Sequence, residues 1–174
     1  MKFLIIIPPK DFKDESVSLV KLLLDKWSVR YDISSYTSND CIGTHGAVYR
    51  PTIHASKAVS TNYDGLVLID GNGIEAYKLY DYRPLLDLVM HFNDSNKYII
   101  SLGNSVKIPA RANIVREKRI SVVDDRETIR LVNLFHGVPS KNEYEIAGNL
   151  ISIKDTGNAM EDPLVKILDS IGAS

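Results

Sequence analysis

The feature that most constrains this fold is a set of short, continuously apolar runs. Lys2–Ile7 reads KFLIII, Gly65–Ile69 reads GLVLI and Tyr98–Ser101 reads YIIS. Runs of this length without polar alternation are typical of strands covered on both faces, as in parallel sheets. Segments with helical spacing separate them, and strands that alternate with helices predict an α/β fold. We expect a single three-layer domain over residues 1–174, with helices on both faces of a mostly parallel sheet.

The remaining segments supply further elements of this fold. Alternation over 29–36 predicts a second strand, residues 121–123 a short strand, and 144–153 a hairpin that turns at Gly148-Asn149. Helices are expected from Asp14 to about residue 27, over 81–92 with Pro84 in the first turn, and up to residue 133 after a capping box formed by Asp124 and Glu127. A last helix is expected to begin at Asp162-Pro163, with Leu164, Ile167, Leu168 and Ile171 facing inward.

Composition excludes several classes of protein. The 174 residues are 44% hydrophobic, and 21 basic residues balance 22 acidic ones. This balance gives no broad field that would favour nucleic acid or an anionic membrane as partner. No run approaches the roughly 20 apolar residues that span a bilayer, so we expect a cytoplasmic protein. Cys41 is the single cysteine, which excludes an internal disulfide and any multi-cysteine metal site.

Three loops follow the apolar strands and define a candidate site. In an open α/β sheet, ligands bind outside the carboxyl ends of the strands. That edge is expected to carry residues 8–13, 70–73 and 102–105. The loop at 70–73 reads DGNG and can adopt positive φ at several positions. The last of the three reads LGNS and is a strand-turn-helix junction, where α/β enzymes often hold a nucleophile.

Motifs in this order resemble the ThiJ/PfpI family, whose fold is that of the class I glutamine amidotransferases. The resemblance rests on the first strand with residues 11–14 (DFKD), the run 63–68 (YDGLVL) with its glycine-rich loop, and the junction 97–105. In addition, residues 43–46 (GTHG) match a turn of the PfpI-type intracellular proteases, and 148–152 (GNLIS) match their late hairpin. The resemblance covers nearly the whole chain.

The resemblance implies a catalytic cysteine on the elbow after residue 102, and this chain lacks it. Gly103 stands at the cysteine position, Asn104 at the adjacent histidine and Ser105 at the following glycine. Covalent catalysis needs an activated nucleophile, which glycine cannot supply. Glycine can nevertheless keep the elbow, because it adopts positive φ without the strain that other residues pay.

Other positions that the resemblance assigns to chemistry have changed as well. A glutamate that would support the cysteine corresponds to Lys13, and a histidine after the late hairpin corresponds approximately to Asp155. A glycine pair that supplies oxyanion-hole amides corresponds to Asp70-Gly71. We hypothesise that Lys13 faces the altered site within about 6 Å of the Gly103 turn and pairs there with Asp70 or Asp155, replacing the dyad with a charged pocket.

The other candidates for chemistry are weaker. Cys41 is far in sequence from the elbow, and a packed thiol is the simpler interpretation. Ser101 and Ser105 lack the G-x-S-x-G context of a serine nucleophile. His45 and His54 have no third ligand nearby, so no metal site is expected. Residues 71–76 (GNGIEA) do not match a dinucleotide or phosphate loop, so no cofactor is expected.

Three functions stay open from the sequence. The first is a catalytically degenerate ThiJ/PfpI-like protein that binds a small molecule or partner protein, and it is motivated by the joint changes at the family's catalytic positions. The second is an enzyme of altered mechanism, a peptidase or amidase or a glyoxalase-type lyase. The third is a structural subunit, since such proteins commonly form homodimers or larger homo-oligomers. The expected ligand-binding residues are Lys13, Asp70, Gly71, Gly103, Asn104 and Ser105.

Overall fold

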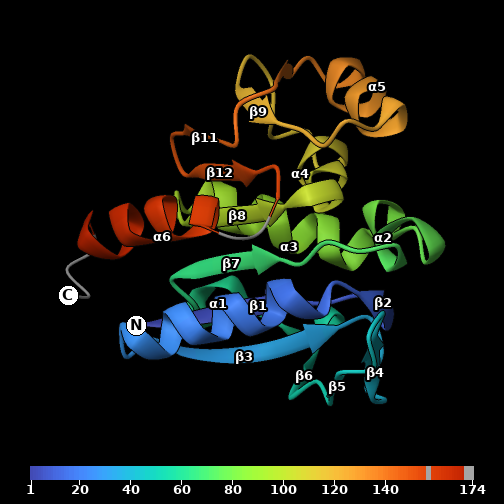
Figure 1. Ribbon diagram of the computed structural model, residues 1–174, viewed down its shortest axis with the longest axis vertical. Helices are drawn as coiled ribbons and strands as arrows, with labels where there is room; N and C mark the ends of the chain where they lie inside the picture. Colours follow the sequence, from blue (N-terminus) through green and yellow to red (C-terminus); the bar gives the residue numbers. More distant parts are fainter. Residues whose placement is uncertain (156–157, 171–174) are drawn as a thin grey trace.

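The computed structural model describes residues 1–155 and 158–170, and its centre is a seven-stranded sheet, which Figure 1 shows running through the molecule. The strand order is β11-β12-β8-β7-β1-β3-β6, and all neighbouring pairs except β11 with β12 are parallel. The strands are β1 (Lys2–Ile6), β3 (Arg30–Ser35), β6 (Ile53–His54), β7 (Gly65–Leu68), β8 (Tyr98–Leu102), β11 (Tyr144–Ala147) and β12 (Leu150–Ile153). The mostly parallel sheet predicted from the apolar runs is confirmed.

Helices cover both faces of this sheet. Helices α1 (Asp14–Lys26) and α6 (Asn158–Ser170) pack on one face, where Phe3 and Ile5 of β1 lie at 0% exposure. Helix α3 (Arg83–Asp94) and the short α4 (Lys107–Arg111) pack on the other, against Leu4 and Ile6 of the same strand. Figure 1 shows α1 and α6 on the near side of the sheet. Successive side chains of β1 are thus buried on opposite faces of the sheet, as its unbroken apolar run predicts.

Smaller elements complete the described chain. Strands β2 (Lys10–Phe12), β4 (Cys41–Gly43) and β5 (Val48–Tyr49) form a three-stranded sheet, and β9 (Arg119–Ser121) pairs with β10 (Val138–Ser140). Helices α2 (Gly73–Ala76) and α5 (Arg126–Leu134) follow β7 and β9. The short 3-10 helices are η1 (Ala55–Lys57), η2 (Ser60–Asn62), η3 (Leu79–Asp81) and η4 (Gly103–Val106). No helix in the described ranges is long and apolar enough to cross a membrane.

Three sequence predictions about these elements were wrong in detail. The cap of α5 is Asp125, not Asp124, because the Asp125 carboxylate accepts the backbone N–H of Thr128 at 3.2 Å. The preceding strand accordingly ends at Ser121. Helix α6 begins at Asn158 and contains Pro163, because Met160 is buried on the same side as the predicted inward residues. The predicted inward residue Ile171 lies outside the described residues.

Candidate functional site

A polar cleft of about 390 Å³ opens at the carboxyl ends of the parallel strands. The strand order places β1 between β3 and β7, so the chain reverses its winding direction at the β1–β7 boundary. Such a switch point leaves a crevice that α/β proteins use for ligands. The cleft lies there, and its lining residues are Lys13, Asp70, Gly71, Asn72, Gly103, Asn104, Val123, Asp124, Lys154 and Asp155. Five of the six predicted ligand-binding residues therefore share one cleft.

The junction after β8 is the expected elbow. Gly103 has φ +51°, a left-handed conformation that costs other residues about 1–2 kcal/mol. Ser105 stabilises the turn, because its hydroxyl donates to the carbonyl of Leu68 at 2.9 Å and accepts the N–H of Leu102 at 2.9 Å. Ser105 is fully buried, and these bonds satisfy its hydroxyl. The structure therefore does not bring this predicted residue to the cleft wall.

The space that a side chain on the elbow would need is filled by Asp70. A Cβ atom placed on Gly103 would lie 2.5 Å from Asp70 Oδ2 and 2.9 Å from Asp70 Cβ. Asp70 lies in the loop just after β7 and is only 6% exposed. A carboxylate thus stands where the resemblance implies a thiol.

Asp70 is held in place by α1. Its Oδ1 accepts the hydroxyl of Ser16 at 2.6 Å, and its carbonyl accepts the backbone N–H of Lys13 at 2.9 Å. Burial raises the pKa of Asp70, although the Ser16 hydroxyl and the nearby Lys13 ammonium both act to lower it. The ionised carboxylate is therefore costly in this position.

The main-chain amide after Asp70 is occupied by Asn104. The N–H of Gly71 donates to Asn104 Oδ1 at 3.1 Å, and Asn104 Nδ2 donates to the carbonyl of Gly71 at 2.9 Å. The predicted loop has positive φ at Gly71 alone, since Asn72 is right-handed helical and Gly73 begins α2. The amide that the resemblance assigns to an oxyanion hole is thus already bonded to a side chain.

Lys13 forms an ion pair with Asp155, one of the two partners that we hypothesised from the sequence. Its ammonium donates to Asp155 Oδ1 at 2.6 Å, and both residues line the cleft with Gly103. The side chains are 35% and 73% exposed, so solvent screens the pair and its contribution to stability is small. The pKa of Lys13 is raised because the bond to Asp155 and the charge of Asp70 outweigh desolvation by burial.

The weaker candidates lie elsewhere. Cys41 is 0% exposed in β4, and burial raises the pKa of its thiol. His54 caps η1 by accepting the N–H of Ser56, and the His45 ring lies 3.6 Å from Glu15 at the surface. Within residues 1–155 and 158–170, no group of three metal-ligating side chains comes together.

Sequence reasoning missed several residues of the cleft. Asp124 and Lys154 lie just beyond β9 and β12, and Val123 lies between β9 and α5. The position of Lys154 after β12 was a usable signal, because β12 is parallel to β8 and the carboxyl ends of parallel strands share one edge. Val123 and Asp124 gave no such signal, because β9 pairs with β10 outside the central sheet. Ser16 gave no such signal, since it read only as part of the first helical turn.

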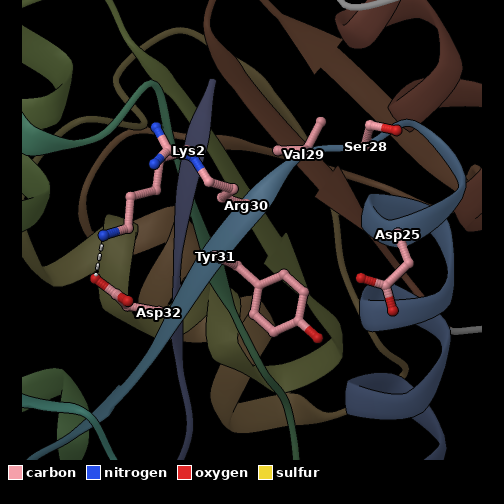
Figure 2. A pocket seen from close by; sticks show the side chains of 7 residues that line it. All are labelled: Lys2, Asp25, Ser28, Val29, Arg30, Tyr31 and Asp32. Atoms are coloured by element: carbon pink, nitrogen blue, oxygen red, sulfur yellow. Dashed lines mark ion pairs between the residues drawn. The ribbon is translucent and has the colours of Figure 1, made fainter.

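A second hollow of about 550 Å³ lies near the amino ends of β1 and β3. Figure 2 shows Lys2 and Asp32 turned toward each other, with Asp25 on the neighbouring helix α1. Lys2 Nζ lies 2.9 Å from Asp32 Oδ2, which also accepts the hydroxyl of Tyr63 at 2.7 Å. Lys2 and Asp32 thus neutralise each other, and they lie at the amino ends of the strands, where ligands of α/β proteins do not normally bind. The hollow is therefore a weaker candidate than the cleft at Gly103.

A mostly parallel seven-stranded sheet with helices on both faces is a flavodoxin-like α/β fold. Solved ThiJ/PfpI and DJ-1 superfamily structures share it. A ThiJ/PfpI domain protein from Brachyspira murdochii superimposes with a TM-score of 0.88 at 18% identity, over 99% of this chain and 97% of that one. A DJ-1 superfamily protein from Agrobacterium tumefaciens gives 0.83 at 14% identity, over 100% of this chain and 91% of that one. DJ-1beta of Drosophila melanogaster gives 0.79 at 12%, over 99% and 91%.

These structures confirm, at the level of the fold, the ThiJ/PfpI resemblance found in the sequence. In sequence, the chain is 26% identical over 153 residues to an uncharacterized protein of Methanocaldococcus jannaschii, which covers 88% of this chain and 74% of that protein. No family model matches the sequence. Function must therefore be argued from the site.

Replacing Asn104 tests how the elbow is tied to the loop after β7. Asn104→Ala removes both bonds to Gly71, and we expect a loss of about 1–2 kcal/mol of unfolding free energy. Hydrogen exchange at the Gly71 amide should accelerate. Asn104→Asp is the matched variant, because it keeps an acceptor for the Gly71 N–H and loses the donor. Equal Gly71 exchange in the alanine variant and the unmodified protein would contradict the bonding described above.

Proposed function

We propose that this chain is a ThiJ/PfpI-like protein that performs no covalent catalysis and binds a small molecule in the cleft at Gly103. The observation that carries the proposal is the position of Asp70 Oδ2, 2.5 Å from where a Cβ on Gly103 would lie. A lost nucleophile alone leaves an empty elbow. Here a buried carboxylate has taken its space.

Two further features support the loss of the thiol chemistry. Lys13 replaces the supporting glutamate and is paired with Asp155. The Gly71 amide is bonded to Asn104 and cannot also receive an oxyanion without breaking that bond. The nucleophile position thus holds a glycine beside Asp70, the position of the supporting carboxylate holds a lysine paired with Asp155, and the Gly71 amide is retained but bonded to Asn104.

Two properties of the cleft support ligand binding: its volume, and the folding free energy that its buried carboxylate costs. Its volume of about 390 Å³ lies within the roughly 300–1,000 Å³ usual for small-molecule sites. A buried carboxylate with a raised pKa costs folding free energy, and groups of this kind cluster in functional sites. Such a group inside a cleft favours a retained ligand site.

Activity assays test the absence of covalent catalysis. We expect peptidase, amidase and glyoxalase substrates to turn over no faster with the purified protein than in buffer. Cys41→Ala is the control, because it removes the chain's single thiol from a fully buried position. Turnover that survives purification and disappears in Cys41→Ala would show that the buried thiol reacts. Robust turnover that persists in this variant would equally refute the proposal.

Assembly stays a separate prediction. The sequence resemblance favours a homodimer or larger homo-oligomer, and an exposed apolar face on α6 would support a structural role. The apolar residues Met160, Leu164, Ile167 and Leu168 of α6 are instead buried within the chain. Light scattering of the purified protein measures the assembly directly.

A further inference from the structure

The charged side chains of the cleft differ in whether they already have partners. Lys13 and Asp155 bind each other at 2.6 Å. Asp124 and Lys154 line the same cleft, and neither side chain makes a hydrogen bond or an ion pair with any residue that the structure describes. One carboxylate and one ammonium therefore face the cleft without a partner in the described chain.

These two charges come from separate segments whose backbone is held in place. Lys154 directly follows β12, and its backbone N–H donates to the carbonyl of Glu143 at 2.8 Å. Asp124 lies between β9 and α5, where the backbone N–H of Asp125 donates to the carbonyl of Val123 at 2.8 Å. The two side chains do not pair with each other, so a ligand that binds both has to extend between them.

A ligand of a single charge fits this lining poorly. An anion that reaches Lys154 also meets the carboxylates of Asp124 and Asp70. A cation that reaches Asp124 also meets the ammonium groups of Lys154 and Lys13. A molecule that carries both charges can pair with each of the two side chains, and Val123 offers an apolar contact for a short carbon chain.

We infer that the ligand of this cleft is a small ω-amino acid whose ammonium donates to Asp124 and whose carboxylate accepts from Lys154. This inference rests on the proposed binding function and names the class of its ligand. Both ends form charge-assisted hydrogen bonds, which are stronger than neutral ones. An α-amino acid carries both charges on one carbon atom and spans less of the distance between the two side chains.

Titration with 4-aminobutanoate tests this assignment, with butanoate and butylammonium as matched probes that each keep a single charge. The zwitterion should shift the amide resonances of Gly71 and Gly103, which line the cleft. Its affinity should exceed that of either probe by about tenfold or more, because each probe lacks one charge-assisted hydrogen bond. Asp124→Asn and Lys154→Gln should each weaken binding of the zwitterion by about tenfold or more for the same reason.

Two variants outside the cleft control for general changes in charge. Asp87→Asn on α3 and Lys57→Gln in η1 remove the same charges and should leave the affinity unchanged. The titration of the unmodified protein keeps the test independent of variant folding. Absence of zwitterion binding to the unmodified protein, or equal binding in Asp124→Asn and Lys154→Gln, would overturn the inference.

Reversing one charge at a time should change which probe is preferred. Lys154→Glu leaves carboxylates of two walls facing the cleft and should favour butylammonium over butanoate by about tenfold or more. Asp124→Lys should favour butanoate by a similar factor. If neither variant changes the preference between the probes, Asp124 and Lys154 do not contact the ligand and the inference is wrong.

Failure of the ligand assignment and failure of the binding function are distinguishable. If butanoate or butylammonium binds the unmodified protein as tightly as 4-aminobutanoate and shifts Gly71 and Gly103, the cleft binds small molecules and only the ligand class is wrong. Robust turnover in the activity assays that persists in Cys41→Ala would refute the proposed function, whatever the titration shows.

Discussion

Gly103→Cys is expected to destabilise the protein by about 2–5 kcal/mol, even though it restores the residue type that the ThiJ/PfpI resemblance implies. Left-handed φ costs a cysteine about 1–2 kcal/mol, and overpacking typically adds about 1–3 kcal/mol. The overpacking arises because the new Cβ would lie 2.5 Å from Asp70 Oδ2. Denaturant unfolding followed by circular dichroism measures the loss, which corresponds to a fall in Tm of roughly 4–20 °C.

Gly148→Cys separates the two contributions to this loss. Gly148 has φ +64°, and no atom lies within 4 Å of the position of an added Cβ, so only the conformational cost applies. We expect a loss of about 1–2 kcal/mol there. If Gly103→Cys costs no more than Gly148→Cys, Asp70 does not occupy the elbow in the way described.

Asp70→Gly should relieve the clash and open the elbow. In a Cys41→Ala background, Gly103→Cys with Asp70→Gly is expected to regain most of the overpacking loss and to react with a thiol-specific reagent at least tenfold faster than buried Cys41 does in the unmodified protein. Adding Lys13→Glu supplies the carboxylate that the resemblance assigns to that position. An unreactive thiol in both combinations would count against the alignment that places the catalytic cysteine at residue 103.

The fold was predictable because its signals are local. The continuous apolar run of β1 indicates burial on both faces, and Gly148 marks a hairpin turn that has φ +64° in the structure. Helix ends were less predictable, since the start of α6 depends on Met160 reaching the core and not on the Asp162-Pro163 signal. Tertiary packing decides such boundaries.

The sequence predicted which residues meet at the site, but not how their side chains are arranged there. Residues that follow parallel strands meet at one edge, so Asp70 and Gly103 were expected together. The sequence cannot show that Asp70 Oδ2 fills the space beside Gly103, or that Asn104 bonds the Gly71 amide. Both facts depend on side-chain rotamers across loops about 30 residues apart. These two facts also distinguish a turn that has only lost its cysteine from one whose space and main-chain amide are taken by other side chains.

Gly71→Ala is expected to cost at least about 3 kcal/mol, because strained backbone and close packing coincide there. Gly71 has φ +138°, and an added Cβ would lie 2.8 Å from Phe12 Cα and 2.9 Å from the Lys13 nitrogen. These are backbone atoms that cannot rotate away. The loop after β7 would have to separate from β2, which breaks the 2.9 Å bond from Lys13 N–H to the carbonyl of Asp70. Thermal unfolding should show a fall in Tm of roughly 6–12 °C.

Gly46→Ala provides the matched control, since Gly46 has φ +90° and no atom within 4 Å of an added Cβ. We expect that variant to lose only about 1–2 kcal/mol. Equal losses in the two variants would disprove the close approach of the two backbone segments. A larger loss at Gly71 means that packing alone requires glycine at a position where the resemblance implies an oxyanion-hole amide. Retention of Gly71 is then no argument for retained catalysis, and the chemistry of the cleft has to be judged from Asp70.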